Sequence, residues 1–385
     1  GASAIFAGCI KAATEYRDTH NWIFMLLPVA GVLIVFMYEK IGRQDGGTNQ
    51  VLATIKSKDD VPFLSAPLIF VSTLLTHLTG GSAGREGASI QFGGSIGNWL
   101  GKLAHLDEFD HHVMIMCGMS AAFAAVFGTP MAAAVFAMEV VSVGVMYYAA
   151  LLPCVIAAII AAEFATGMGI DPETFPVHSI PGLTVESGLK MALIAVGCGI
   201  LSILFCILLK TVGQLYAKYL KNPYIRIVVA AGVIILITIC LNTKDYMGAG
   251  SGLIARAIEK GEARPLDFLW KMLLTALTMR AGYRGGEIVP AFSIGATFGC
   301  VAGGILGFSP ELAAAAGMVA LFCGVTNCPI TAMLISFELF GFSGAAYYLI
   351  AISISYAVSG YYSLYKDQTI VYSKYKARYI NRKTR

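Results

Sequence analysis

The sequence predicts an all-α integral membrane protein, built from many short, tilted and interrupted helices in two repeated halves. The chain has 385 residues, of which 57% are hydrophobic and only 13% are charged, and its mean hydropathy is +0.72. In a soluble globular protein, about a quarter of the residues are charged. Long uncharged stretches, helix breakers inside them and an internal repeat together indicate the interrupted helices.

Eight uncharged stretches are near or beyond the ~20 residues with which an α-helix crosses the hydrocarbon core of a bilayer. Breakers are expected to divide several of them into two shorter helices, because proline and glycine disrupt a continuous helix. In chain order the stretches are 61–84, 111–138, 140–162, 191–209, 227–243, 288–310, 312–337 and 339–365. The breakers are Gly128-Thr129-Pro130, Pro153, Gly303-Gly304 and Cys328-Pro329.

The two ends of the chain and its composition indicate the environment of the protein and the classes of partner that it can bind. Residues 1–13 resemble the end of an apolar helix without an initiator Met, so we expect the chain to begin inside a span. The basic tail 374–385 is expected to lie in the cytoplasm. A net charge of +4 is too small to suggest nucleic acid, and the nine cysteines form no CxxC pair and no His–Cys metal pattern. We therefore expect a lipid environment and neither a metal nor a cofactor.

The segment 118–139 matches the segment 317–338 without a gap and at a constant offset. Glycine and alanine are common in membrane helices, so part of such a match can arise by chance. A chance origin explains the matched prolines and glutamates less well, because they recur at a fixed offset and in the same order in both halves. They are Pro130 with Pro329 and Glu139 with Glu338.

A glycine-rich loop precedes each copy, and its glycines also correspond: Gly84, Gly93 and Gly97 with Gly286, Gly295 and Gly299. The repeat predicts one transmembrane domain, with a first membrane repeat over 1–183 and a second over 184–385 that includes the short basic tail. Duplicated halves with paired interrupted helices are typical of transporters, whose binding site lies near the midplane where the repeats meet. The sequence leaves open whether the two halves have opposite orientations.

The first glycine-rich loop, Gly-Gly-Ser-Ala-Gly-Arg-Glu-Gly-Ala at 80–88, places Arg85 and Glu86 directly after an uncharged stretch. Charged residues at the centre of a membrane helix cost about 2.5 to 3.5 kcal/mol on insertion scales, so they are functional candidates. Glycines let backbone amides approach an ion, and a helix that begins near Gly87 directs its positive dipole end to the same place. This pattern indicates an anion site beside a carboxylate. The structural alternative is that Glu86 pairs with Arg85 at the membrane surface.

At these residues the chain resembles the CLC family of anion channels and anion/proton antiporters. The family loop G-R/K-E-G-P is similar to residues 84–88, with Ala88 in place of proline. A second family loop, G-G-x-F-x-P followed by G-A-x-x-G, is similar to 285–290 and 295–299, with Ile288 where phenylalanine is usual. The resemblance extends from about residue 1 to 370 and implies the CLC-type fold.

The resemblance implies two further anion-binding elements. The family loop G-S-G-I-P corresponds to residues 46–50, where Gly47 replaces the serine and Thr48 and Asn49 follow it. The anion-contacting tyrosine of the family, at the start of the last helix, corresponds to Tyr362, with Tyr361 and Tyr365 as competitors.

Three departures from the common pattern resemble the bacterial fluoride/proton antiporter branch, CLC-F. They are Glu287 in the second loop, the missing serine at Gly47, and Val140 where many chloride antiporters carry a proton-accepting glutamate. The implied function is export of fluoride in exchange for protons by a homodimer in the bacterial inner membrane. A chloride/proton antiporter and a passive anion channel are the alternatives within the family. An intramembrane enzyme is an alternative of another class, but the sequence has no HExxH motif and no acid dyad at a fixed spacing.

In this interpretation the Glu86 carboxylate and the anion compete for one set of backbone donors, and protonation of Glu86 couples their movements. For Glu287 three roles stay open: a protonated donor to the anion, a proton relay, or a cap on backbone N–H groups. Fluoride is strongly hydrated, so its removal from water requires several short, well-aligned donors. The expected anion-binding residues are Gly84, Arg85, Gly87, Gly286, Ile288, Val289, Tyr362, Gly47, Thr48 and Asn49.

Overall fold

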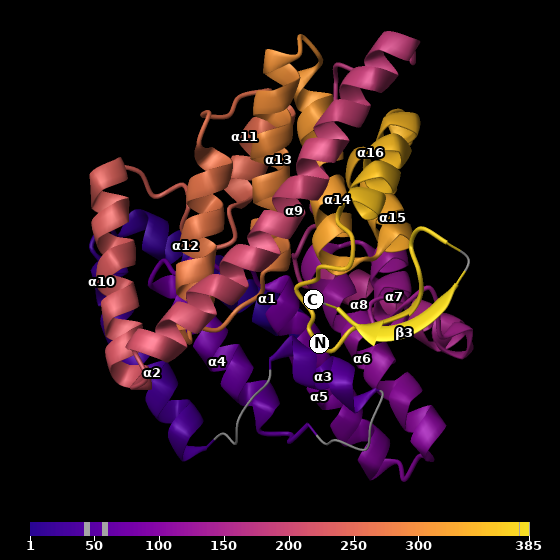
Figure 1. Ribbon diagram of the computed structural model, residues 1–385. Coiled ribbons are helices and arrows are strands. Elements are labelled where there is room, and N and C mark those ends of the chain that lie inside the picture. Colours follow the sequence, from indigo (N-terminus) through magenta and orange to yellow (C-terminus); the bar gives the residue numbers. More distant parts are fainter. Residues whose placement is uncertain (42–46, 56–60, 377, 385) are drawn as a thin grey trace.

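The computed structural model describes residues 1–41, 47–55, 61–376 and 378–384, and helices make up most of it (Figure 1). Up to residue 183 the helices are α1 (Ala2–Thr19), α2 (Leu27–Lys40), α3 (Thr48–Thr54), α4 (Ser65–Leu78), α5 (Glu86–Leu103), α6 (Glu108–Phe127), α7 (Pro130–Glu139) and α8 (Leu151–Gly167). Two short 3₁₀ turns, η1 (Ile23–Leu26) and η2 (Tyr148–Ala150), precede α2 and α8. After residue 183 the helices are α9 (Val185–Tyr219), α10 (Pro223–Leu241), α11 (Ser251–Glu259), α12 (Asp267–Ala281), α13 (Ile288–Ile305), α14 (Pro310–Thr326), α15 (Pro329–Phe340) and α16 (Ala345–Val358).

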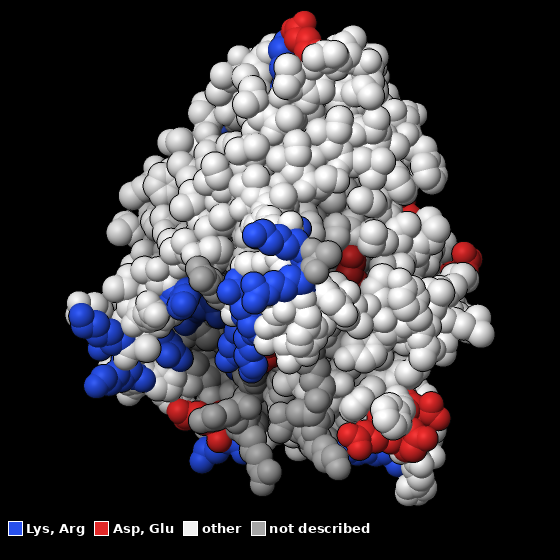
Figure 2. Space-filling view, turned by 45° about the vertical axis from the view of Figure 1, so that its right-hand side comes forward, with Lys and Arg blue, Asp and Glu red and all other residues white. Residues whose placement is uncertain are grey.

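The surface and the helix lengths fit a membrane protein, as predicted. Within the described residues, six helical segments are long and apolar enough to cross a membrane, among them α6, α9, α10 and α13. Figure 2 shows one face on which the charged side chains gather at the upper tip and in the lower part, with a broad uncharged surface between them. Large apolar side chains such as Leu152, Ile160 and Leu193 are exposed, and their contact with water would be unfavourable. Lipid or another apolar surface therefore covers them.

Two of the predicted helix breaks are confirmed. Helix α6 ends at Gly128, whose φ of 75° is left-handed, and α7 begins at Pro130. In the same way α14 ends at Asn327, with a φ of 60°, and α15 begins at Pro329. At the first position of a helix the missing N–H of proline leaves no hydrogen bond unmade, so proline starts the new helix.

The other two predicted breaks are wrong. Pro153 lies in the first turn of α8, where a proline is tolerated, and the stretch 140–162 is instead interrupted before it. Gly303 and Gly304 remain within α13, because a glycine weakens a helix by only about 1 kcal/mol and does not end it. Gly303 is needed for packing, since a Cβ at that position would lie 2.6 Å from the Cβ of Ala313 in α14.

The two matching segments run in opposite directions. Figure 1 shows the connection between α5 and α6 near the bottom of the molecule and the connection between α13 and α14 near the top. Each pair packs closely through glycines: a Cβ on Gly118 would lie 2.2 Å from the carbonyl oxygen of Gly93, and one on Gly317 would lie 2.4 Å from that of Gly295. The question of orientation that the sequence left open is therefore answered by an inverted arrangement of these elements.

The repeated glutamates hold the two copies together. Glu139, at the end of α7, accepts hydrogen bonds from the N–H groups of Ile330 and Thr331 at the start of α15, at 3.0 and 2.8 Å. Glu338 of α15 accepts from the N–H groups of Met131 and Ala132 at the start of α7, both at 2.9 Å. The first N–H groups of a helix have no acceptor within it, and a carboxylate there also complements the helix dipole. Each copy thus caps a helix of the other copy.

Replacing Gly118 by Ala should destabilise the protein by about 1 to 3 kcal/mol or more, because the added methyl overlaps the backbone of α5 and forces α5 and α6 apart. The thermal unfolding midpoint in detergent measures this loss. Gly232→Ala is the matched control: Gly232 lies within α10 with open space around it, so that variant should be neutral or slightly more stable. Equal unfolding midpoints for Gly118→Ala and the wild type would contradict the close α5–α6 contact.

The end of the chain forms strands where the sequence predicted a last helix starting at Tyr362. Strand β1 (Ser142–Val143) pairs in parallel with β2 (Thr369–Tyr372), which pairs in antiparallel with β3 (Tyr379–Lys383). The β2 segment, Thr-Ile-Val-Tyr, consists of β-branched and aromatic residues, which favour strands over helices. Gln368 fixes the segment in place, since its side-chain amide donates to the carbonyl groups of Val140 and Thr326 at 3.0 and 2.7 Å.

Lys374, between β2 and β3, covers the ends of α14 and α16. Its ammonium donates to the Asn327 side chain, the Tyr356 carbonyl and the Ser359 hydroxyl, at 2.5, 3.1 and 3.1 Å. Burial of the ammonium lowers the pKa of Lys374 from 10.5 to about 8. Between these two pH values the unfolded chain keeps a proton that the folded chain has lost. Burial of the ammonium therefore destabilises the folded state below about pH 8, and this cost disappears as the pH rises to 10.5.

The free energy of unfolding of the wild type should therefore rise relative to that of Lys374→Met between pH 8 and 10.5, by on the order of 1 to 3 kcal/mol. Denaturation curves at closely spaced pH values measure the difference. Lys376→Met, at an exposed neighbouring position, should follow the wild type at every pH. Parallel curves for wild type and Lys374→Met would show that the buried amine does not titrate in this range.

Candidate functional site

The two glycine-rich loops meet at the centre of the candidate site. The N–H of Gly84 donates to the carbonyl of Gly286, and the N–H of Gly286 donates to the carbonyl of Gly84, both at 2.7 Å. A Cβ on Gly286 would lie 2.5 Å from the backbone nitrogen of Gly87. Side chains are thus excluded from this junction, and it brings the beginnings of α5 and α13 together.

The junction is rich in backbone N–H groups that the helices leave without acceptors. Helix α5 begins at Glu86 and α13 begins at Ile288, and the first N–H groups of any helix have no intrahelical partner. The N–H groups of Gly87, Ala88, Ile288 and Val289 therefore lie at the positive dipole ends of two helices. Such a place attracts an anion or a carboxylate.

Glu86 brings a carboxylate to this junction. Its side chain is 1% exposed, and it accepts from the Arg85 backbone N–H at 3.1 Å and from Arg85 Nε at 3.2 Å. A Cβ on Gly84 would lie 3.3 Å from Glu86 Oε2, so the carboxylate lies against the glycine loop. The alternative of an ion pair at the membrane surface is correct as to the pair with Arg85 and wrong as to the surface, because the carboxylate is buried.

A cavity of about 610 Å³ collects five further predicted residues. Gly47, Thr48, Asn49, Glu287 and Tyr362 all line it, although they come from three separate parts of the sequence. Glu86 does not line this cavity. The structure thus brings the first predicted loop, the second loop and the tyrosine to one space, with Glu86 buried at the adjoining loop junction.

Glu287 directly precedes α13, but its side chain makes no cap hydrogen bond there, so the capping role is wrong. Its Oε1 lies 3.6 Å from Nη2 of Arg280, and both side chains are partly exposed to the cavity. Arg284 also lines the cavity and stacks over the Tyr38 ring at 4.0 Å. A carboxyl group beside the Arg280 guanidinium, next to open amides, is placed to contact an anion or to pass a proton.

Within the first loop, Thr48 and Asn49 differ in what they can offer. The Thr48 hydroxyl donates to the carbonyl of Gly87 at 3.1 Å, which ties α3 to the start of α5 and engages the hydroxyl proton. Asn49 lines the cavity, and its buried side-chain oxygen has no partner in the described part of the chain. The oxygen and nitrogen of a carboxamide are assigned from their partners, so this group presents a polar end to the cavity in either orientation.

The structure separates the three candidate tyrosines. The Tyr361 hydroxyl hydrogen-bonds the Ser373 hydroxyl at 2.8 Å, and its ring lies beneath Arg382, so Tyr361 faces the terminal strands. Tyr362 and Tyr365 both line the cavity. The position of Tyr362 agrees with its predicted role, and Tyr365 is a second hydroxyl at the same wall.

Several polar residues at the site were not predicted from the sequence. Gln91 of α5 and Lys210 of α9 line the cavity. Lys271 of α12 is fully buried behind the first glycine loop and donates to Ser82 Oγ and to the carbonyl groups of Tyr246 and Gly248, at 3.0, 3.0 and 2.7 Å. A lone lysine within an apolar helix is a signal that could have identified Lys271.

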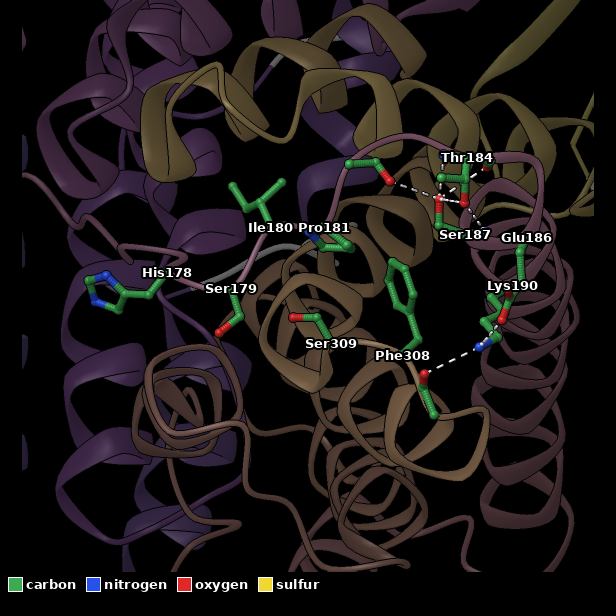
Figure 3. Close-up of a pocket in the computed structure, with 12 residues that line it drawn as sticks. His178, Ser179, Ile180, Pro181, Thr184, Glu186, Ser187, Lys190, Phe308 and Ser309 are labelled. Carbon is green, nitrogen blue, oxygen red and sulfur yellow. Dashed lines mark hydrogen bonds and ion pairs between the residues drawn. The ribbon is translucent and has the colours of Figure 1, made fainter.

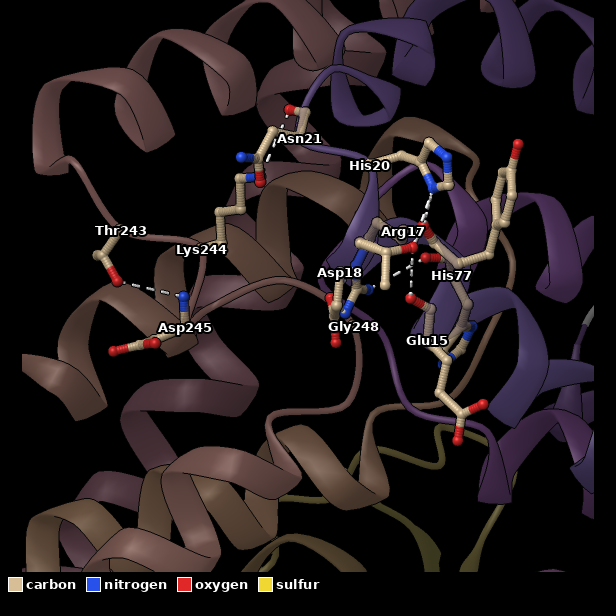
Figure 4. A network of polar contacts seen from close by, with 12 residues as sticks. Glu15, Arg17, Asp18, His20, Asn21, His77, Thr243, Lys244, Asp245 and Gly248 are labelled. Carbon is tan, nitrogen blue, oxygen red and sulfur yellow. Dashed lines mark hydrogen bonds and ion pairs between the residues drawn. The ribbon is translucent and has the colours of Figure 1, made fainter.

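The loop is held from its other side by the segment around Gly248. The N–H of Ala83 donates to the Gly248 carbonyl at 3.1 Å, and the N–H of Gly248 donates to the Gly81 carbonyl at 3.0 Å. Arg17 of α1 lies against Gly248 and donates to the His77 carbonyl at 3.1 Å (Figure 4). These contacts fix the backbone of the loop, so motion at the site is left to side chains.

An open hollow of about 710 Å³ on another part of the surface was also considered as a site (Figure 3). Its polar groups are engaged with one another: Thr184 and Ser187 form a capping box at the start of α9, and Lys190 bonds Glu186 at 2.8 Å and the Gly307 carbonyl at 3.3 Å. This hollow therefore offers less to a ligand than the cavity beside Glu287.

Comparisons with known proteins show similarity over most of the chain. The sequence model of the voltage gated chloride channel family matches residues 30–360. A chloride/fluoride channel protein of Pseudomonas syringae pv. tomato is 34% identical over 97% of this chain and 84% of its own length. The crystal structure of a CLC-type fluoride/proton antiporter is 33% identical, with a TM-score of 0.91 over 95% of this chain and 93% of that chain. The crystal structure of a slow cyanobacterial Cl⁻/H⁺ antiporter, 17% identical, has the same fold, with a TM-score of 0.80 over 93% and 90% of the two chains.

Proposed function

Since the chain belongs to the CLC family of anion channels and transporters, we propose that it moves fluoride out of the cell in exchange for protons. It is a multi-pass integral protein of the bacterial cell membrane. The family resemblance implies a homodimer with one pathway in each subunit. The protein is a transporter in this proposal and not an enzyme.

One observation carries the proposal. The carboxylate of Glu86 is buried where the open N–H groups of α5 and α13 converge, so the same donors can serve either a carboxylate or an anion. An ionised Glu86 therefore excludes the anion from this place. A protonated Glu86 has no negative charge, so these N–H groups attract it less and it can leave. Occupation by the anion is in this way linked to uptake of a proton.

The choice of fluoride rests on the residues around the cavity. A small, strongly hydrated anion requires several short donors, and the backbone N–H groups and the Tyr362 hydroxyl supply them beside Glu287. Gly47 occupies the place of the serine that chloride transporters of the family commonly have. The similarity to a fluoride/proton antiporter over nearly the whole chain supports the same choice.

Purified protein in liposomes provides the test, with fluoride and pH electrodes recording at the same time. A fluoride gradient alone should drive protons in the opposite direction against their own gradient, and chloride should compete weakly. Fluoride flux without proton movement would indicate a passive channel. Preferred transport of chloride would indicate a chloride/proton antiporter.

A further inference from the structure

Arg85 is shared between two carboxylates, one of which no sequence motif identified. Its Nε contacts Glu86 Oε1 at 3.2 Å, and its Nη2 contacts Glu173 Oε1 at 2.5 Å. The exposed fractions of these side chains are 1% for Glu86, 17% for Arg85 and 22% for Glu173. Glu173 therefore lies on the solvent side of Arg85, and Glu86 lies on the buried side.

Backbone contacts on both sides of Glu173 define its position. Pro172 packs on Gly128, where a Cβ would lie 2.5 Å from the Pro172 Cα atom. Phe175 is buried, and its N–H donates to the Leu339 carbonyl at the end of α15 at 2.9 Å. The segment from 172 to 175 is thus anchored to both broken-helix pairs, so the place of Glu173 does not depend on its ion pair with Arg85.

The shared arginine bears on the movement of Glu86. A buried guanidinium that loses its only carboxylate is left as an unpaired buried charge, which is strongly unfavourable. With Glu173 present, Arg85 keeps a partner when Glu86 becomes neutral and moves away. The negative charge of Glu173 also opposes ionisation of Glu86, because like charges within a few ångströms repel.

The charged groups near this cluster are few. Arg85 and Glu173 act on the Glu86 carboxyl group. Glu86 and Glu173 act on Arg85. Arg85, Arg17 of α1 and Lys271 of α12 all lie within electrostatic range of His77 of α4. Glu173 is thus the one acidic group, among the described residues that act on Glu86, that can balance Arg85 when Glu86 departs.

We propose that Glu173 is a positioning residue for the transport cycle: it retains Arg85 while Glu86 is protonated and displaced, and so sets the pH range in which Glu86 exchanges protons. This inference rests on the proposed function. Glu173 acts through Arg85 and does not contact the anion.

Glu173→Gln tests the inference in liposomes. Without the second carboxylate, Arg85 holds the ionised Glu86 more strongly, and protonation of Glu86 requires a lower pH. Proton-coupled fluoride transport should fall severalfold at pH 7 and recover in acid, with the pH profile displaced to lower pH by about one unit. Glu173→Asp, which keeps the charge, should restore a profile close to that of the wild type.

Glu186→Gln is the matched control, because Glu186 pairs with Lys190 at the surface and does not touch Arg85. Its profile should equal that of the wild type. A Glu173→Gln profile that coincides with the wild type, or that is lowered equally at every pH, overturns the positioning role. If the wild type itself moves no protons with fluoride, the proposed function fails first, and the transport cycle assigned to Glu173 fails with it.

Discussion

Glu86→Gln should abolish proton-coupled fluoride transport, lowering the number of protons moved per fluoride by about 100-fold or more. Glutamine has the shape of a protonated glutamate but carries no proton that can be released and regained. The variant therefore cannot alternate between the ionised state that Arg85 holds and the neutral state that vacates the junction. Anion passage without protons is expected to persist, because the N–H groups at the starts of α5 and α13 are unchanged. Paired fluoride and pH electrodes measure both fluxes.

Glu259→Gln provides the control for this variant, since it makes the same chemical change at an exposed position at the end of α11. That variant should keep the wild-type ratio of protons to fluoride. If Glu86→Gln also keeps that ratio, the competing-carboxylate mechanism is wrong.

Glu287→Ala is expected to lower fluoride turnover, and the preference for fluoride over chloride, by about 10- to 100-fold, which is the effect of losing one hydrogen bond to a charged group. Stability should change little, because Glu287 is partly exposed and makes no cap hydrogen bond at α13. Flux assays with each anion and thermal unfolding measure the two effects separately. Unchanged flux and preference would make Glu287 a structural residue.

Glu287→Gln separates the two roles that remain for this residue. An amide can still donate a hydrogen bond to the anion, so a donor role predicts retained selectivity. A relay role predicts lost proton coupling, because the amide cannot take up and release a proton.

Much of the fold follows from local chemistry that is visible in the sequence. The breaks at Pro130 and Pro329 were predicted because proline favours the first position of a helix and disrupts its interior. Pro153 causes no break, because it lies within the first turn of α8, where a proline is tolerated. The terminal strands were missed because the last helix was inferred from family resemblance, while the β-branched segment 369–372 favours a strand.

The candidate site was predictable where a motif encodes it and not where distant segments meet. The glycine loops revealed Gly84, Glu86 and Gly286 because backbone approach requires glycine. The ion pair between Arg85 and Glu173 joins residues far apart in the sequence, so no local pattern announces it. The matched glutamates of the repeat were recognised as a pair, but their role as caps on each other's helices required coordinates.

The central claim is that fluoride and the ionised Glu86 compete for the same backbone donors. Calorimetry of fluoride binding in buffers of different ionisation enthalpy measures it most directly, because it counts protons bound together with the anion. At pH 8.5 the wild type should take up close to one proton per fluoride bound, and Glu86→Gln should take up none. Fluoride binding to the wild type without proton uptake would contradict the claim.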